Sequence, residues 1–317
     1  MAGYELVLNM SENWTIWEPR DARAQVAAAV AAEAAGFGGV MFSEHVVLGA
    51  GSDVHGTPMN PREFASPGNQ QPSYPWPSSI VLMSAAAAAT ERIRIIGGAV
   101  LAALRHPLLL AKELGTLDLL SEGRLVVLPS VSWHEAEYRA LGVPFDRRGD
   151  VLDEVLEVLH AVWGGSQVSH HGAYFHFDDI WVEPKAFRPE GPAMWFGGAT
   201  VHDRVVQRLV RHGSGLMGNG PIAAADIERV RAAFVAAGRN PDELELVSGI
   251  GGRFSDSTSC ADLDEALMKF GVRLDAGFRT FVVKPCQFID DANHLPEFLA
   301  EIIDKTRRIA AERIEMP

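Results

Sequence analysis

Short apolar runs alternate with longer helical patterns along almost the whole chain. Runs of this kind are typical of strands that are buried on both faces of a parallel sheet. We predict strands over residues 4–9, 39–43, 93–97, 125–128, 194–197, 215–217, 244–249 and 280–283. The patterns between them predict helices over residues 21–35, 78–90, 107–120, 150–163, 202–211, 223–237, 261–276 and 294–311. This alternation indicates crossover helices between parallel strands.

Residues at the ends of these patterns support the helix boundaries. Pro107 suits the first turn of a helix, where its missing N–H is not needed. Gly36, Gly238 and Gly277 follow predicted helices at positions that favour a left-handed cap. The eight strand–helix pairs match a barrel, whereas a doubly wound open sheet usually has about five or six strands. We therefore predict an α/β fold, a (β/α)8 TIM barrel.

Length and composition fit one such domain. A barrel takes about 250 residues before insertions, so a chain of 317 residues predicts a single domain over residues 1–317. Hydrophobic residues make up 47% of the chain and charged residues 22%. This balance is typical of a globular protein with a large core, and it excludes a disordered chain.

Two long segments interrupt the alternation and predict insertions. Residues 44–77 follow the second strand and are rich in proline, glycine, asparagine and glutamine. A loop of this length is usually a lid or a binding loop, and it follows the carboxyl end of a strand, where barrel active sites form. Residues 164–192 precede the fifth barrel strand, and residues 168–177 within them predict a β-hairpin.

Charge and cysteine content narrow the class of partner and the compartment. The net charge of −13 argues against a nucleic-acid partner, although an anionic cofactor needs only a local positive site. Cys260 and Cys286 are too few for a disulfide framework, which favours a reducing cytoplasm. We find no secretory signal pattern at the N-terminus and no apolar run long enough to span a membrane. The sequence thus predicts a soluble cytoplasmic protein.

Common motifs for nucleophiles, metals and phosphate loops are absent from the sequence. His170, His171 and His176 lie close together in the predicted hairpin, but neighbouring side chains of a strand point to opposite faces. We therefore predict no metal site there.

Two short segments at predicted strand ends could carry chemistry. Glu44 and His45 follow the second strand, where a histidine either moves a proton or anchors the long loop. Gly197, Gly198, Ala199 and Thr200 lie between a strand and a helix, where backbone N–H groups can bind a phosphate. Glycines also make ordinary turns at such junctions, so both interpretations remain open.

The end of the fourth strand and several loop aromatics are further candidates. Ser130 and Ser132 could donate to a phosphate, or Ser132 could be the N-cap of a helix over residues 133–141. Aromatic side chains that could line an apolar substrate pocket, or equally fix the loops to the body, are Trp14, Tyr74, Trp76 and Trp133.

The order of several segments resembles the luciferase-like monooxygenase superfamily, the bacterial luciferase-like oxidoreductases that use a flavin or coenzyme F420. The segments are residues 36–45, 90–98, 105–113, 117–125, 133–145 and 195–198. The Ser43-Glu44-His45 ending of the second strand and the proline-rich loop after it are most similar to the F420-dependent branch.

This resemblance implies FMN or coenzyme F420 across the carboxyl mouth of the barrel. His45 would lie near the reactive edge of the ring system, and Ala99 and Val100 under it, with a non-prolyl cis peptide between those two residues. The phosphate side would be formed by Ser130, Val131 and Ser132 together with Gly197, Gly198, Ala199 and Thr200. A homo-oligomer, such as a dimer, is also implied.

We therefore expect hydride transfer between coenzyme F420 and a small organic substrate, with His45 donating a proton and Glu44 orienting His45. The alternative is an FMN-dependent monooxygenase that uses reduced flavin. A second alternative is a non-catalytic barrel without a cofactor, because residues 128–132 read Leu-Pro-Ser-Val-Ser where the family usually has a glycine-rich motif.

Overall fold

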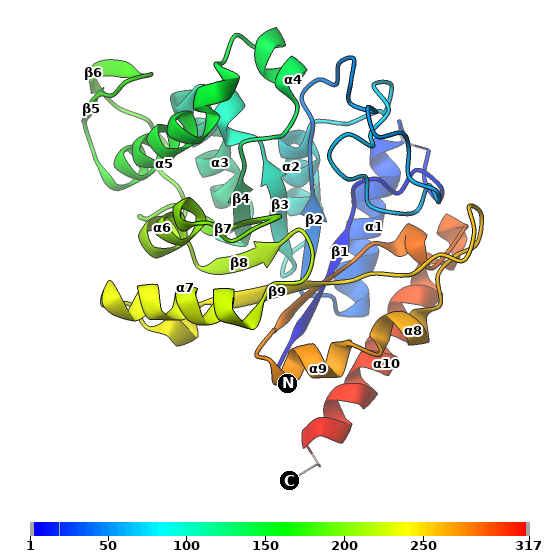
Figure 1. Cartoon of the computed structure of the whole chain (residues 1–317). Helices are drawn as coiled ribbons and strands as arrows, with labels where there is room; N and C mark the ends of the chain where they lie inside the picture. Colours follow the sequence, from blue (N-terminus) through cyan, green and yellow to red (C-terminus); the bar gives the residue numbers. More distant parts are fainter. Residues whose placement is uncertain (1–2, 19, 315–317) are drawn as a thin grey trace. The chain divides into compact units, whose positions relative to one another are not determined.

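The computed structural model describes residues 3–18 and 20–314, and its strands form a closed parallel barrel (Figure 1). The strands follow one another around the barrel in the order β1 (Glu5–Asn9), β10 (Thr280–Val283), β9 (Glu245–Ile250), β8 (Gly215–Gly218), β7 (Ala193–Gly198), β4 (Leu125–Pro129), β3 (Arg94–Val100) and β2 (Gly39–Phe42). Each lies at a predicted strand position, so the predicted (β/α)8 barrel is confirmed.

The helices also lie where the sequence predicts them, with one exception. They are α1 (Ala22–Ala35), α2 (Ser79–Ala89), α3 (Pro107–Leu120), α4 (Glu135–Ala140), α5 (Arg148–Gly164), α6 (Asp203–His212), α7 (Ala224–Ala236), α8 (Leu263–Leu267), α9 (Phe270–Asp275) and α10 (Leu295–Ile314). Short 3-10 turns cover Ala102–Leu104, Phe145–Arg147, Pro241–Glu243, Pro285–Gln287 and Ala292–His294. The single helix predicted over residues 261–276 is wrong, because α8 and α9 are separate. The chain makes a turn at Met268 and Lys269, between the two helices.

Helix ends follow the predicted chemistry. Asp21 is the N-cap of α1, and its side chain accepts a hydrogen bond from the Ala24 N–H at 3.0 Å. Gly36 ends α1 with a φ of 98° and donates to the carbonyls of Ala32 and Glu33. Pro107 is in the first turn of α3, as expected.

The described residues fall into two compact units. One contains residues 3–41 (without residue 19), 57–65 and 196–314, and the other contains residues 42–56 and 66–195. In the first unit, α10, red in Figure 1, packs against α1 and α9. In the second unit, α3 packs against α2 and α5. Each unit has a buried apolar core, with Phe234 and Phe281 in the first and Ile95 and Val155 in the second.

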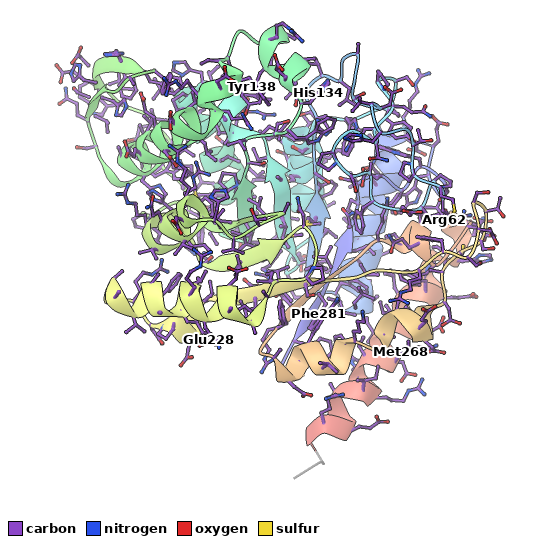
Figure 2. All side chains as sticks on the ribbon, viewed as in Figure 1. Arg62, His134, Tyr138, Glu228, Met268 and Phe281 are labelled. Carbon is purple, nitrogen blue, oxygen red and sulfur yellow. The ribbon has the colours of Figure 1, made fainter. Side chains whose placement is uncertain are left out.

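The predicted long loop after β2 contains no helix or strand within the described residues. Its middle part, residues 57–65, belongs to the first unit and is held there by side chains. Asn60 Nδ2 donates to the carbonyls of Asp256 and Ser259 at 3.0 and 2.8 Å. Arg62, labelled in Figure 2, donates to the Thr258 carbonyl at 2.8 Å. This part of the loop is therefore fixed to the segment that follows β9.

The predicted hairpin is confirmed as β5 (Val168–His171) and β6 (His176–Ile180), an antiparallel pair. The Glu154 carboxylate of α5 accepts from the N–H groups of Ala173, Tyr174 and Phe175, and lies 3.2 Å from His170 Nε2. Burial opposes ionisation of Glu154, but the bonds from Phe175, Tyr174 and His170 outweigh it and lower its pKa. The ionised carboxylate therefore stabilises the turn of the hairpin.

We expect the turn of this hairpin to loosen in acid. A lowered folded-state pKa means that the stabilisation is complete above the ordinary glutamate pKa of about 4.3 and is lost as the pH falls through the folded-state value. Protection factors for the Ala173, Tyr174 and Phe175 amides, measured by hydrogen exchange, should fall across that range. In a Glu154→Gln variant they should be low and independent of pH; a pH dependence unchanged from the wild type would contradict this.

None of the helices within the described residues is both long and apolar enough to cross a membrane.

Candidate active site

His45 lies just beyond the carboxyl end of β2, and its side chain is only 7% exposed. Its Nδ1 atom is 3.4 Å from the Glu137 carboxylate. The indole rings of Trp76 and Trp133 meet the imidazole edge-on, with ring centroids at 5.2 and 5.8 Å. The ring is therefore held on three sides, and its Nε2 atom is on the side opposite to the carboxylate contact.

Glu137, on α4, is fully buried and accepts several hydrogen bonds. One carboxylate oxygen accepts from the Val46 and Val47 N–H groups at 2.6 and 3.2 Å. The other accepts from the Ser132 hydroxyl at 2.8 Å. Burial alone opposes ionisation, but the bonds from His45, Ser132 and Val46 outweigh it and lower the pKa of Glu137. An ionised carboxylate thus sits at the centre of this cluster.

His134, labelled in Figure 2, precedes α4 and is a second buried histidine. It interacts electrostatically with the same Glu137 carboxylate. Its Nε2 accepts a hydrogen bond from the Gly49 N–H at 2.8 Å, so this nitrogen carries no proton. Burial, with the nearby His45 and Arg139, outweighs the attraction of Glu137 and lowers the pKa of His134. His134 therefore anchors the loop as a neutral acceptor.

The predicted role of Glu44 in orienting His45 is wrong. The Glu44 carboxylate binds the Arg105 guanidinium through both terminal nitrogens at 2.7 and 2.9 Å. It also accepts from the Leu101 N–H and the Ser79 hydroxyl, each at 2.6 Å. Adjacent residues of an extended chain point in opposite directions, so Glu44 faces the chain after β3 while His45 faces α4. Glu44 is an anchor of the strand ends.

Ser132 has a φ of 53°, in the left-handed region that favours glycine. Ser132 is the last residue of the segment that is usually glycine-rich in the superfamily that the sequence resembles. Its backbone adopts a conformation that favours glycine, although the residue is a serine. The hydroxyl donates to Glu137, so it is not available to donate to a phosphate. The Ser130 hydroxyl accepts from the Ser132 N–H at 3.3 Å. Ser132 is also not the N-cap of α4, which is His134.

We expect Ser132→Ala to be more destabilising than Ser132→Gly. Alanine loses the hydrogen bond to a charged group, worth about 2 kcal/mol, and keeps the left-handed backbone. Glycine loses the same bond but relieves about 1 kcal/mol of left-handed backbone cost. Urea unfolding would measure both, with Ser169→Ala, at an exposed hairpin position, as the control. An alanine variant as stable as the wild type would contradict the assigned bond.

Ala99 and Val100 lie at the end of β3, where the pairing with β4 shifts register between Gly98 and Val100. The resemblance implied a cis peptide between Ala99 and Val100. The non-prolyl cis peptide is one residue earlier, between Gly98 and Ala99. Val100 is buried, whereas Ala99 is half-buried, so Ala99 is the residue of this pair that is open to a ligand.

The candidate phosphate segment after β7 lies in the first unit. A Cβ at Gly197 would lie 1.6 Å from the Met217 carbonyl oxygen, so glycine is required there by strand packing. The Gly198 carbonyl accepts from the Asn219 N–H at 3.0 Å. Ala199 and Thr200 are exposed and precede α6. Trp14, in the loop after β1 of this unit, is half-buried.

Among the described residues, no group of three or more histidine, cysteine, aspartate or glutamate side chains is placed to hold a metal ion.

Comparison with known proteins decides the family. The model of the luciferase-like monooxygenase family matches residues 7–313. The chain belongs to this family. The FMNH2-dependent dimethylsulfone monooxygenase of Pseudomonas putida is 29% identical over 168 residues, which cover 50% of this chain and 45% of that protein. The chain therefore matches less than half the length of this curated relative.

Solved structures of luciferase-like enzymes share the fold. The monooxygenase RslO1 from Streptomyces bottropensis has a TM-score of 0.67 at 19% identity, covering 97% of this chain and 98% of that chain. An F420-dependent secondary alcohol dehydrogenase in complex with an F420-acetone adduct has a TM-score of 0.67 at 14% identity, covering 96% and 99%. The fold of this chain is thus shared with a monooxygenase and with an F420-dependent dehydrogenase.

Within this luciferase-like barrel, the structure brings together part of the predicted site. His45 and Ser132 contact one carboxylate, and Trp76 and Trp133 contact the His45 ring. Tyr74 is half-buried in the loop that carries Trp76. The sequence analysis missed Glu137, which lies 92 positions from His45. A glutamate in a short polar helix is ordinarily solvated, so only the buried Tyr138 beside it could have hinted that this helix is partly buried.

Proposed function

We propose that this luciferase-like oxidoreductase transfers a hydride between coenzyme F420 and a small organic substrate. The observation that carries the proposal is His45, whose ring is fixed by a buried carboxylate at Nδ1 and flanked by two indoles. A fixed, water-shielded imidazole suits the proton transfer that accompanies hydride transfer to a carbonyl. The Ser43-Glu44-His45 ending of β2 supports the F420-dependent branch.

Small side chains and hydrogen-bond donors after β3, β4 and β7 are of the kinds that bind a flat ring system and one phosphate. In the second unit, Ala99 presents only a methyl group at the bulge of β3, and Ser130 has a hydroxyl. In the first unit, Gly198, Ala199 and Thr200 precede α6. Hydroxyls and backbone N–H groups before a helix are common phosphate ligands. We propose these residues, with Val131 and Ser132 as backbone contacts, as the cofactor-binding residues.

We propose a separate role for each residue around His45. When bound, the reduced deazaflavin supplies a hydride to the carbonyl carbon of the substrate. His45 donates the proton from Nε2 to the carbonyl oxygen, so the carbonyl becomes an alcohol, and the reverse reaction returns the proton to Nε2. Trp76 and Trp133 keep water from the ring. We propose Trp14 and Tyr74 as further substrate contacts.

A second candidate function is reduced-FMN monooxygenation. The similarity to the FMNH2-dependent dimethylsulfone monooxygenase favours it. In that reaction one oxygen atom of O2 enters the substrate and the other leaves as water. The residues proposed for the cofactor are the same, because FMN also has a flat ring system and one phosphate.

Fluorescence titrations of the purified protein with coenzyme F420 and with FMN test these proposals. Tight binding of F420 alone, followed by substrate-dependent oxidation of reduced F420 without oxygen uptake, is expected. Preference for FMN with oxygen consumption would replace the first candidate with the second. Binding of neither cofactor would favour the non-catalytic barrel and overturn both.

We also propose that the protein is a cytoplasmic homodimer that acts on a small molecule and binds no nucleic acid, in line with its net charge of −13. Light scattering should give twice the chain mass. A monomer at micromolar concentration would overturn the dimer.

A further inference from the structure

We propose that Glu137 is the positioning residue of the site: its carboxylate fixes the tautomer of His45 and also fixes the backbone that follows His45. The positioning of His45 by Glu137 is argued from contacts alone, and only its effect on turnover rests on the proposed function.

The hydrogen bonds around Glu137 determine which nitrogen of His45 carries the proton. One carboxylate oxygen accepts from two backbone N–H groups, those of Val46 and Val47. The other oxygen accepts from the Ser132 hydroxyl and faces His45 Nδ1 at 3.4 Å. An ionised carboxylate only accepts hydrogen bonds, so Nδ1 must be the donor. The neutral ring is therefore the Nδ1–H tautomer, and proton exchange with a substrate is confined to Nε2.

The other polar groups near His45 have partners of their own, which leaves Glu137 as the group at its Nδ1 atom. Glu44, the neighbour in sequence, is paired with Arg105 through both guanidinium nitrogens. His134 accepts a hydrogen bond from the chain at its Nε2. Trp76 and Trp133 meet the imidazole edge-on and carry no charge.

The same carboxylate connects His45 to the loop. Its bonds to the Val46 and Val47 N–H groups fix the two peptides directly after the imidazole. The side chain of Glu137 comes from α4, and Ser132 from the chain after β4. One buried group thus holds the loop after β2, the loop after β4 and the reactive ring in one arrangement.

Glu154 provides a matched comparison. It too is a largely buried glutamate whose carboxylate binds one histidine and consecutive backbone N–H groups, but it does so at the hairpin. A purely structural role would make Glu137 and Glu154 equivalent. The proposal predicts that only Glu137 changes the chemistry of His45.

Nuclear magnetic resonance of 15N-histidine-labelled protein tests this without any cofactor. In the wild type, His45 should be the Nδ1–H tautomer. In Glu137→Gln, whose amide can donate as well as accept, both neutral tautomers of His45 should be seen. In Glu154→Gln the tautomer of His45 should not change. A pure Nδ1–H tautomer in Glu137→Gln would overturn the proposal.

A second variant covers the case in which Glu137→Gln does not fold. Ser132→Ala removes the competing donor from the same carboxylate oxygen, so the bond from His45 strengthens and its Nδ1–H proton resonance should move downfield. No downfield shift in that variant would overturn the proposal.

Kinetics distinguish a failure of the positioning from a failure of the proposed function. In Glu137→Gln, kcat should fall by about tenfold or more, because the tautomer of His45 is no longer fixed, with KM changed less than twofold. If the mixed tautomers appear and no F420- or FMN-dependent turnover is found, the positioning by Glu137 stands and the proposed function fails. A fall in kcat without a change of the His45 tautomer would overturn the positioning.

Discussion

Replacing His45 with glutamine should lower kcat by about 10²–10⁴-fold, the usual contribution of a positioned general acid. Glutamine retains an amide N–H that can donate to Glu137, so the contact that holds the ring has a neutral replacement. The amide cannot deliver a proton near neutral pH, so turnover falls while cofactor affinity changes little. Steady-state kinetics with a fluorescence titration of the cofactor would measure the two effects separately.

The control for this substitution is His170→Gln. His170 is also bound by a buried glutamate, but it lies in the hairpin, so its replacement should leave kcat within twofold of the wild type. If His45→Gln and His170→Gln are equally active, His45 has no part in the reaction. If His45→Gln loses cofactor affinity instead of turnover, its role is binding.

Glu44→Gln should lower the free energy of unfolding by about 3–5 kcal/mol, the range for removing one partner of a buried ion pair. The Glu44 side chain is 2% exposed and that of Arg105 20%. An amide presents a donor where Arg105, the Leu101 N–H and the Ser79 hydroxyl all donate. In urea unfolding, the midpoint should fall with little change in the slope m.

Glu135→Gln provides the matched control for Glu44→Gln. Its carboxylate is 64% exposed and lies 3.9 Å from Arg139, which is 73% exposed, so its loss should change stability by no more than about 0.5 kcal/mol. Equal effects of the two substitutions would show that Glu44 is not the anchor described above. Arg105→Gln added to Glu44→Gln should recover part of the loss, because it removes the unpaired charge.

The order of elements could be predicted because buried strands and amphipathic helices have different periods. The strand near residues 280–283 and the helix near residues 107–120 were placed correctly because their apolar runs are bounded by clear caps and turns. The segment 261–276 was harder, since its apolar positions continue at helical spacing through the break between α8 and α9. The periodicity of apolar residues indicates which positions are buried. A turn that leaves this pattern unchanged cannot be detected from the periodicity.

The site could be predicted only in part, for a related reason. His45 was found because a polar residue directly after a buried strand lies at the carboxyl end of a barrel, whatever the rest of the chain does. Its partner could not be found, since the choice between Glu44 and Glu137 depends on which way each side chain points after folding. Glu44 was predicted as the partner because it is next to His45 in the sequence. Adjacent side chains of an extended chain point in opposite directions, so Glu44 points away from the ring and Glu137 contacts it instead.

The two peptides held by Glu137 have a practical consequence for altering this protein. The N–H groups of Val46 and Val47 are fixed by the carboxylate, yet their side chains are 42% and 39% exposed. Backbone and side chain are therefore independent at these positions, and a combinatorial library there would vary the surface next to His45 while the imidazole keeps its place. Proline is the exception to leave out of such a library, because it has no N–H to donate.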